Sequence, residues 1–245
     1  MIEKYYNGVI EQVAGGIGNV EHNSILVRYS NDFSIWDLES VNHYKDQTDI
    51  FFTCHEFSYN KIAEAYEPYL GLIRQMFHKY CSGTLEEFME ECDVYKLQRP
   101  VFESYFEKGF CERTEQILID EVEYEQERMH SSIVTMLQKL SEICPIVIVL
   151  NRFQLASKST MQLTNRLLQT KNKNIGIVLG VNDVQSIPEF AHEEWDAICE
   201  SMDDRNMVYH IGNAGRNMEP DVMDYYSDYE SDDGYRKLNN LVYFL

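Results

Sequence analysis

Basic residues are scarce in this 245-residue chain: 21 lysines and arginines stand against 41 aspartates and glutamates, giving a formal charge of −20. A field of that sign repels phosphate backbones and anionic lipid headgroups, so we expect neither nucleic acid nor a membrane surface as a partner. Long apolar runs are also missing, because none approaches the ~18 residues of a membrane span. The first residues have no basic stretch followed by an apolar one, so no secretion signal is expected. We therefore expect a cytoplasmic protein.

Cysteine pairs at redox or metal-binding spacing are absent as well. No CxxC occurs, and the six cysteines lie far apart in the sequence, at Cys54, Cys81, Cys92, Cys111, Cys144 and Cys199. We predict reduced thiols and not a disulfide framework. His78 and Cys81 share one helical face, and Cys54-His55 could join them, but no further ligand follows at a recognised zinc spacing. No metal is expected.

Motifs for nucleotide hydrolysis and for nucleophilic catalysis are missing too. The dipeptide Gly-Lys, which the phosphate-binding motif GxxxxGK[ST] requires, occurs nowhere in the chain. The only glycine-rich stretch, residues 15–19, comes before the first predicted strand, so we interpret it as a loop. No GxSxG motif is present to place a serine nucleophile. We therefore expect no catalytic residue and no cofactor.

Paired carboxylates offer the remaining catalytic possibility, at Glu86-Glu87, Glu90-Glu91 and Glu193-Glu194. All three pairs lie on predicted amphipathic helices, where solvated acids are ordinary, so we predict a solvated helix face at each. Thr84 and Glu87 have the spacing of a capping box, which predicts a helix start at this position.

Apolar residues are plentiful at 44%, enough for a sizeable core. Two unbroken apolar runs, Ile146–Leu150 and Ile175–Val181, are typical of strands buried on both faces, and we expect them adjacent and central. Helical patterns separate five β-rich segments, of which the other three lie at 24–29, 49–55 and 207–211. The alternation predicts an α/β fold: a mainly parallel five-stranded sheet with helices on both faces and a helical insertion around 61–143. Within it, one helix should begin near Lys61 and a long one should span about 112–143.

The end of the chain has a different composition. We predict an α/β domain over residues 1–218, followed by an acidic, tyrosine-rich linker over 219–234. Residues 235–245 return to a helical apolar pattern, which we interpret as the start of a C-terminal helical region. Such a short apolar helix is marginal alone, so it should pack either on this domain or on helices that follow it. In the second case its exposed apolar face favours a homodimer through this segment.

A family resemblance rests on residues 143–183. Pro145 precedes five apolar residues and Asn151, then a helix follows that Ser157 or Ser159 would cap, and a second apolar strand ends at Asn182. This series resembles the Walker B to sensor region of the AAA-like signal-transduction ATPases, the STAND class. The resemblance implies a P-loop NTPase-like fold, with Asn151 at the degenerate Walker B position and Asn182 at a sensor-like position.

Two departures from that family bear on the chemistry. Asn151 replaces the acidic residue that holds Mg²⁺, and a neutral amide cannot balance the metal's charge. After the first predicted strand, residues 30–36 contain neither glycine nor lysine, and Asp32 would repel phosphate. The sequence therefore predicts that the chain does not hydrolyse ATP or GTP by the P-loop mechanism.

The expected function is that of a regulatory or interaction domain in a larger bacterial signalling protein. Its partners would be another protein or other domains of the same polypeptide, and the resemblance implies helical repeats among them. Two alternatives stay open: a sensor that binds a nucleotide or small molecule without hydrolysis, and an enzyme of another class on a doubly wound sheet. Either would bind its ligand at the strand ends, near Asn31, His55, Asn151 and Asn182.

Overall fold

The computed structural model describes residues 2–18, 23–30, 33–46, 49–58, 60–61, 63–110, 122–182, 187–203 and 208–211. The predicted linker and C-terminal helical region, 219–245, lie outside these residues. The chain divides into two compact units. Among the described residues, those up to residue 63 and from residue 144 onward form the α/β unit, and those from 64 to 143 form the helical unit.

The α/β unit is built on a parallel sheet in the order β2-β3-β4-β1-β5. The strands are β1 (Ser24–Tyr29), β2 (Phe51–Glu56), β3 (Ile146–Asn151), β4 (Ile175–Asn182) and β5 (Val208–Ile211). Four of them form the body of the sheet, and the short β5 pairs in parallel with the second half of β1. The predicted α/β class and parallel sheet are confirmed. β3 and β4 are adjacent, each has a neighbour on both sides, and every residue of both is buried, as their apolar sequences predict.

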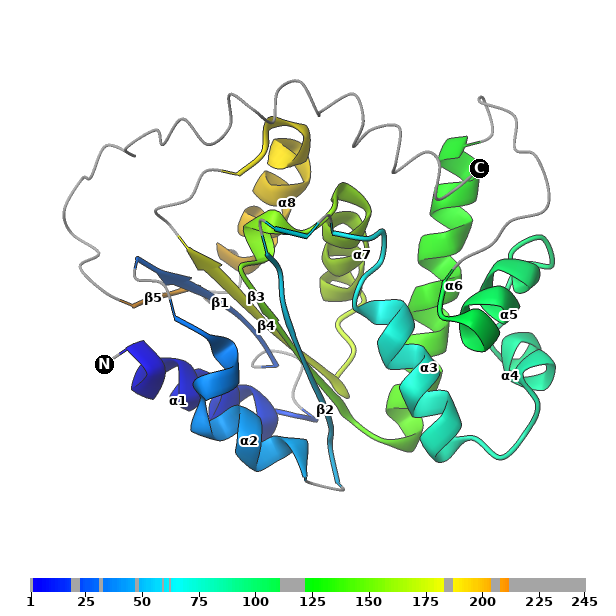
Figure 1. Ribbon diagram of the computed structural model, residues 1–245, viewed down its shortest axis with the longest axis horizontal. Helices are drawn as coiled ribbons and strands as arrows, with labels where there is room; N and C mark the ends of the chain where they lie inside the picture. Colours follow the sequence, from blue (N-terminus) through cyan, green and yellow to red (C-terminus); the bar gives the residue numbers. More distant parts are fainter. Residues whose placement is uncertain are drawn as a thin grey trace. The chain divides into compact units, whose positions relative to one another are not determined.

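Helices cover both faces of this sheet, as expected for parallel strands joined by right-handed crossovers. Figure 1 shows α1 (Ile2–Gly15) and α2 (Glu39–Lys45) together on one face, with α7 (Lys158–Gln169) and α8 (His192–Asp203) on the other. The alternation of side chains along each strand divides the core accordingly. Val147, Val149 and Val178 belong to the cluster that packs with α1, whereas the residues between them point to the opposite face.

Helix α1 lies in a groove made by two glycines of β4. Gly176 and Gly180 are four residues apart and so share one face of the strand. A Cβ atom at Gly176 would lie only 2.7 Å from Cγ1 of Val13, and one at Gly180 would collide with the Tyr6 hydroxyl and lie 2.5 Å from Oδ1 of Asn151. We call these two positions the glycine groove. Because side chains are missing there, the helix approaches the sheet closely.

One predicted solvated acid is in fact buried. Glu194 on α8 is 8% exposed, and its Oε1 accepts a hydrogen bond from Nε2 of Gln162 (2.9 Å) and lies 3.0 Å from Nζ of Lys158. Both partners are on α7. The solvated-face prediction is therefore wrong for Glu194, whose carboxylate joins α7 to α8, and it holds for its exposed neighbour Glu193.

The helical unit contains α3 (Tyr69–Tyr80), α4 (Leu85–Glu91), α5 (Arg99–Lys108) and α6 (Val122–Ile143). The helix expected from Lys61 begins only at Tyr69, because Pro68 disfavours the helical conformation at Glu67 and Tyr66 has a left-handed backbone (φ 62°). The capping box predicted at Thr84 and Glu87 is confirmed. The first part of the predicted 112–143 helix, up to residue 121, lies outside the described residues.

One buried polar side chain of the helical unit, that of Gln98, has hydrogen bonds at both ends of its amide. Gln98 is buried, donates from Nε2 to the backbone oxygen of Glu125 (3.1 Å) and accepts at Oε1 from the Ser132 hydroxyl (2.8 Å). Because both partners lie on α6, these bonds fix the start of α5 against that helix.

Candidate functional site

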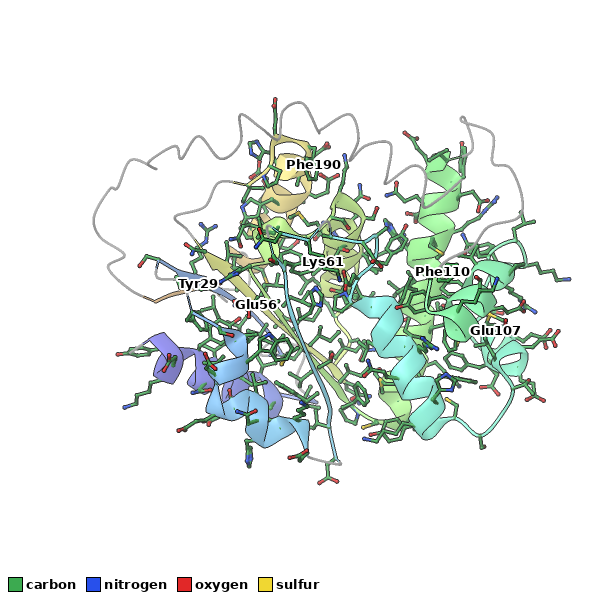
Figure 2. All side chains as sticks on the ribbon, viewed as in Figure 1. Tyr29, Glu56, Lys61, Glu107, Phe110 and Phe190 are labelled. Atoms are coloured by element: carbon green, nitrogen blue, oxygen red, sulfur yellow. The ribbon has the colours of Figure 1, made fainter. Side chains whose placement is uncertain are left out.

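The carboxyl ends of the parallel strands meet at one edge of the sheet. Glu56 pairs in register with Asn151, and Tyr29 pairs with Asn182. Because Leu150 pairs with Leu179, β4 and β1 extend two residues beyond the level of Asn151, and the four strands end close together at this edge. Figure 2 shows Tyr29 and Glu56 at this end. β1 lies between β4 and β5. The chain leaves β1 toward the β2 edge of the sheet, and the later connections run in the opposite direction, from β2 through β3 and β4 to β5. Open α/β sheets bind their ligands at such a point, which makes this edge the candidate site.

Asn151, at the degenerate Walker B position, is the centre of this edge. Its side chain is 0% exposed, and its Oδ1 accepts a hydrogen bond from the Tyr29 hydroxyl at 2.8 Å. Its Nδ2 has no hydrogen-bond partner within the described part of the chain. The amide of Asn151 is thus hydrogen-bonded by the phenol of Tyr29 at the end of β1. Sequence analysis identified Asn151 but not its partner, which is 122 residues away.

Three aromatic rings pack together beside this amide. Tyr6 of α1, Tyr29 of β1 and Phe33 of the following loop meet edge to face, with centroids 6.3 Å (Tyr6–Tyr29), 5.3 Å (Tyr6–Phe33) and 4.9 Å (Tyr29–Phe33) apart. Tyr6 and Tyr29 are fully buried. Burial raises the pKa of the Tyr6 hydroxyl well above its ordinary value, and Tyr29 adds to the rise, so Tyr6 stays protonated. We call these three residues the aromatic plug.

An acidic residue that sequence analysis missed lies at the end of β2. Oε2 of Glu56 accepts a hydrogen bond from the Ile35 backbone N–H (3.1 Å), and its Oε1 lies 3.5 Å from Nη1 of Arg152. Arg152, directly after β3, has a left-handed backbone (φ 53°). Glu56 therefore ties the 3₁₀ turn η1 (Ile35–Asp37), which follows β1, to the ends of β2 and β3. We call this arrangement the Glu56 latch.

The sensor-like Asn182 ends β4 and is also buried. Its backbone N–H donates to Oε1 of the fully buried Gln154 at 3.4 Å. Gln154 belongs to the 3₁₀ turn η3 (Phe153–Leu155), which follows β3, so this bond connects the loops after two neighbouring strands. The structure thus brings both predicted residues, Asn151 and Asn182, to the candidate edge, where Asn151 is bonded through its side chain and Asn182 through its backbone.

The other residues proposed for the strand ends are placed differently. Asn31 lies outside the described residues. The ring of His55 lies 4.5 Å from the Phe57 ring, edge to face. Successive residues of a strand point to opposite faces, so His55 and Glu56 do not share one.

Cys54, in the middle of β2, is one of the four residues considered for a zinc site. Burial raises the pKa of Cys54 to about 12, partly offset by Lys45, so its thiol is a poor nucleophile near neutral pH. Cys54 and His55 belong to the α/β unit, whereas His78 and Cys81 belong to the helical unit. Among the described residues, no group of three or more histidines, cysteines or acids is arranged to hold a metal ion.

A search for bilayer-crossing helices in the described ranges finds none that combines the necessary length with sufficient hydrophobicity. Comparison of the sequence with protein-family models and with curated proteins finds no match.

Proposed function

We propose that this chain is a catalytically inactive, P-loop-NTPase-like α/β domain that serves as a regulatory or interaction scaffold in a larger bacterial signalling protein. The observation that carries the proposal is the buried hydrogen bond between Tyr29 and Asn151, packed under Tyr6 and Phe33. A hydrolytic site at this edge would need an acid free to hold Mg²⁺ and a loop free to wrap phosphate. Here the amide is neutral and already engaged.

The loop after β1 supports the same conclusion. In a P-loop this segment leaves its backbone N–H groups free for phosphate. In this chain the Ile35 N–H is donated to Glu56, the Ile35 side chain is buried in the core cluster, and Phe33 packs against Tyr6 and Tyr29 in the aromatic plug. The segment therefore serves packing, which fits a sheet used as a scaffold.

Among the described acids, Glu56 lies at this edge, and it cannot easily substitute for the missing one. Glu56 reaches the end of β2 beside Asn151, but its two oxygens are used by Ile35 and Arg152. Releasing the carboxylate for a metal would leave the partly buried Arg152 guanidinium without this counter-charge, which is costly. We infer that Glu56 serves the architecture of the edge and not catalysis.

The proposed partners are another protein or further domains of the same polypeptide, with helical repeats implied by the family resemblance. The negative charge of the chain supports protein partners over nucleic acid and membranes.

The decisive experiment measures hydrolysis and binding separately. We expect the purified chain with Mg²⁺ and ATP or GTP to show no phosphate release above a buffer blank, and no nucleotide-dependent rise in melting temperature. Asn151→Asp restores the acid but not the phosphate loop, so it should not gain activity. Turnover that is lost in Asn151→Ala would contradict the proposal. A rise in melting temperature without turnover would favour the nucleotide-sensor alternative.

A further inference from the structure

Helix α1 is attached to the sheet almost entirely by apolar contact. Tyr6, Val9, Ile10 and Val13 are buried against the core cluster of the α/β unit. Asn7 adds polar contacts, since its Oδ1 accepts hydrogen bonds from the backbone N–H (3.0 Å) and the hydroxyl of Ser40 on α2. Just beyond the helix, the Gly18 N–H donates to the backbone oxygen of Lys173 at 2.7 Å, which anchors the chain at that point.

The contact has a defect at the tip of Tyr6. The Tyr6 hydroxyl and Nδ2 of Asn151 are both fully buried, and neither has a hydrogen-bond partner within the described residues. The Tyr6 hydroxyl and the Asn151 side chain both approach the position that a Cβ of Gly180 would occupy, so they meet in the same confined place. A buried polar group without a partner destabilises the state that buries it, because it has lost its hydrogen bonds to water.

The two groups lie on opposite sides of one contact. Tyr6 belongs to α1 and Asn151 belongs to β3, so removing α1 from the glycine groove returns the phenol and the amide to water together. Hydrogen bonds within the sheet are unaffected by such a movement, because α1 contributes none of them. Docking of α1 therefore has a free-energy cost, because it buries these two polar groups without partners.

We infer that α1 is a releasable helix, which opens about its Gly18 anchor and uncovers the carboxyl edge of the sheet while the sheet stays folded. Local openings of this kind draw on the least stable elements of a domain. The opened state exposes Asn151, Tyr29 and the glycine groove. The opening of α1 would control access to the carboxyl edge of the sheet. The opening itself does not depend on the proposed scaffold function, but its regulatory role rests on that function.

Native-state hydrogen exchange of the whole chain tests the inference with a pair of conservative variants. Tyr6→Phe removes the unpartnered hydroxyl, so amide exchange in α1 should slow on the order of tenfold, while exchange in α7 should stay as in the unaltered protein. Tyr5→Phe removes a hydroxyl from the neighbouring residue, which is 58% exposed, and should change neither helix. Val13→Ala weakens the groove contact and should accelerate exchange in α1.

The inference is overturned if Tyr6→Phe leaves α1 exchange unchanged or accelerates it, because the hydroxyl would then be neutral or favourable in the docked state. It is also overturned if α1 and α7 slow together, because α1 would then open only with the whole unit. Should Val13→Ala fold poorly, the comparison of Tyr6→Phe with Tyr5→Phe still decides. None of these results depends on nucleotide assays, so the proposed function can fail or stand separately.

Discussion

At the scale of single residues, Gly180 is the position in β4 where an added methyl group has the least room. The Tyr6 hydroxyl and Oδ1 of Asn151 already occupy the place of its Cβ. We expect Gly180→Ala to destabilise the α/β unit by about 1 to 3 kcal/mol, because overpacking forces the surrounding side chains out of their positions. Urea unfolding measures the change.

Gly8→Ala is the matched control for this prediction. Gly8 lies on the exposed side of α1, and an added Cβ would meet nothing within 4 Å. Alanine is the better helix former, so this variant should be stabilised by up to about 1 kcal/mol. If both alanine variants gave the same change, the close approach of α1 to β4 would not exist in solution. Adding Tyr6→Phe to Gly180→Ala should restore part of the lost stability.

The buried carboxylate of Glu194 should contribute to the stability of the α/β unit. Glu194→Ala removes a carboxylate that bonds Gln162 and Lys158, so we expect a loss of about 1.5 to 3 kcal/mol, the range for hydrogen bonds to charged groups. Glu193→Ala, at the exposed neighbouring position, should stay within about 0.5 kcal/mol. Thermal unfolding of the pair compares them. Equal losses would mean that the contact between α7 and α8 does not depend on Glu194.

At the scale of elements, the strands that could be predicted best are those with the strongest local pattern. The unbroken apolar runs of β3 and β4 indicate burial on both faces, and both strands are central. The start of α3 was predicted too early, because the apolar stripe continues through residues that Pro68 excludes from the helix. Here the backbone restriction imposed by Pro68 overrode the helical periodicity of the apolar residues.

The candidate site could be located but not described from the sequence. Asn151 and Asn182 were identified because each ends an apolar strand. Their partners were not, because the bond from Tyr29 to Asn151 and the pairing of Glu56 with Arg152 join distant segments. Glu56 lies beside Asn151 because of the register between β2 and β3, and this register is a tertiary property that one sequence does not reveal.

Helix α4 provides an element-scale prediction on pH. Thr84 donates from its backbone N–H and its hydroxyl to Oε2 of Glu87, and these bonds lower the pKa of that carboxyl. A lowered folded-state pKa means stability that is present above the ordinary carboxyl pKa and is lost as pH falls through the lowered value. Glu87→Gln should therefore be less stable than the unaltered chain near neutral pH and equal to it in strong acid.

Unfolding measured across this pH range checks that prediction, with Glu86→Gln as control, since no cap bond at Thr84 involves Glu86. A difference between Glu87→Gln and the unaltered chain that persists unchanged into strong acid would contradict it.

At the scale of the whole molecule, we predict self-association through the last eleven residues. They lie outside the described residues, and the prediction rests on sequence: one helical face would carry Tyr235, Leu238, Leu241, Val242 and Leu245. An isolated helix of roughly three turns is marginal in water, so it should pack on a second copy. We expect the chain to form dimers by light scattering, and a chain ending at residue 234, or one with Leu241→Asp, to be monomeric. A monomeric full chain would contradict the prediction.

The order in which the strands are joined has a consequence for biosynthesis. β1 pairs with β4 and β5, so a ribosome must make about 150 further residues before β1 has a partner. At translation rates of about 5 to 20 residues per second, β1 stays without a neighbouring strand for about 8 to 30 seconds. The helical unit, made in that interval from contacts close in sequence, can fold first. Newly made chains should therefore need chaperone protection while β1 and β2 wait, and pauses placed after residue 143 should increase aggregation more than pauses placed after residue 203.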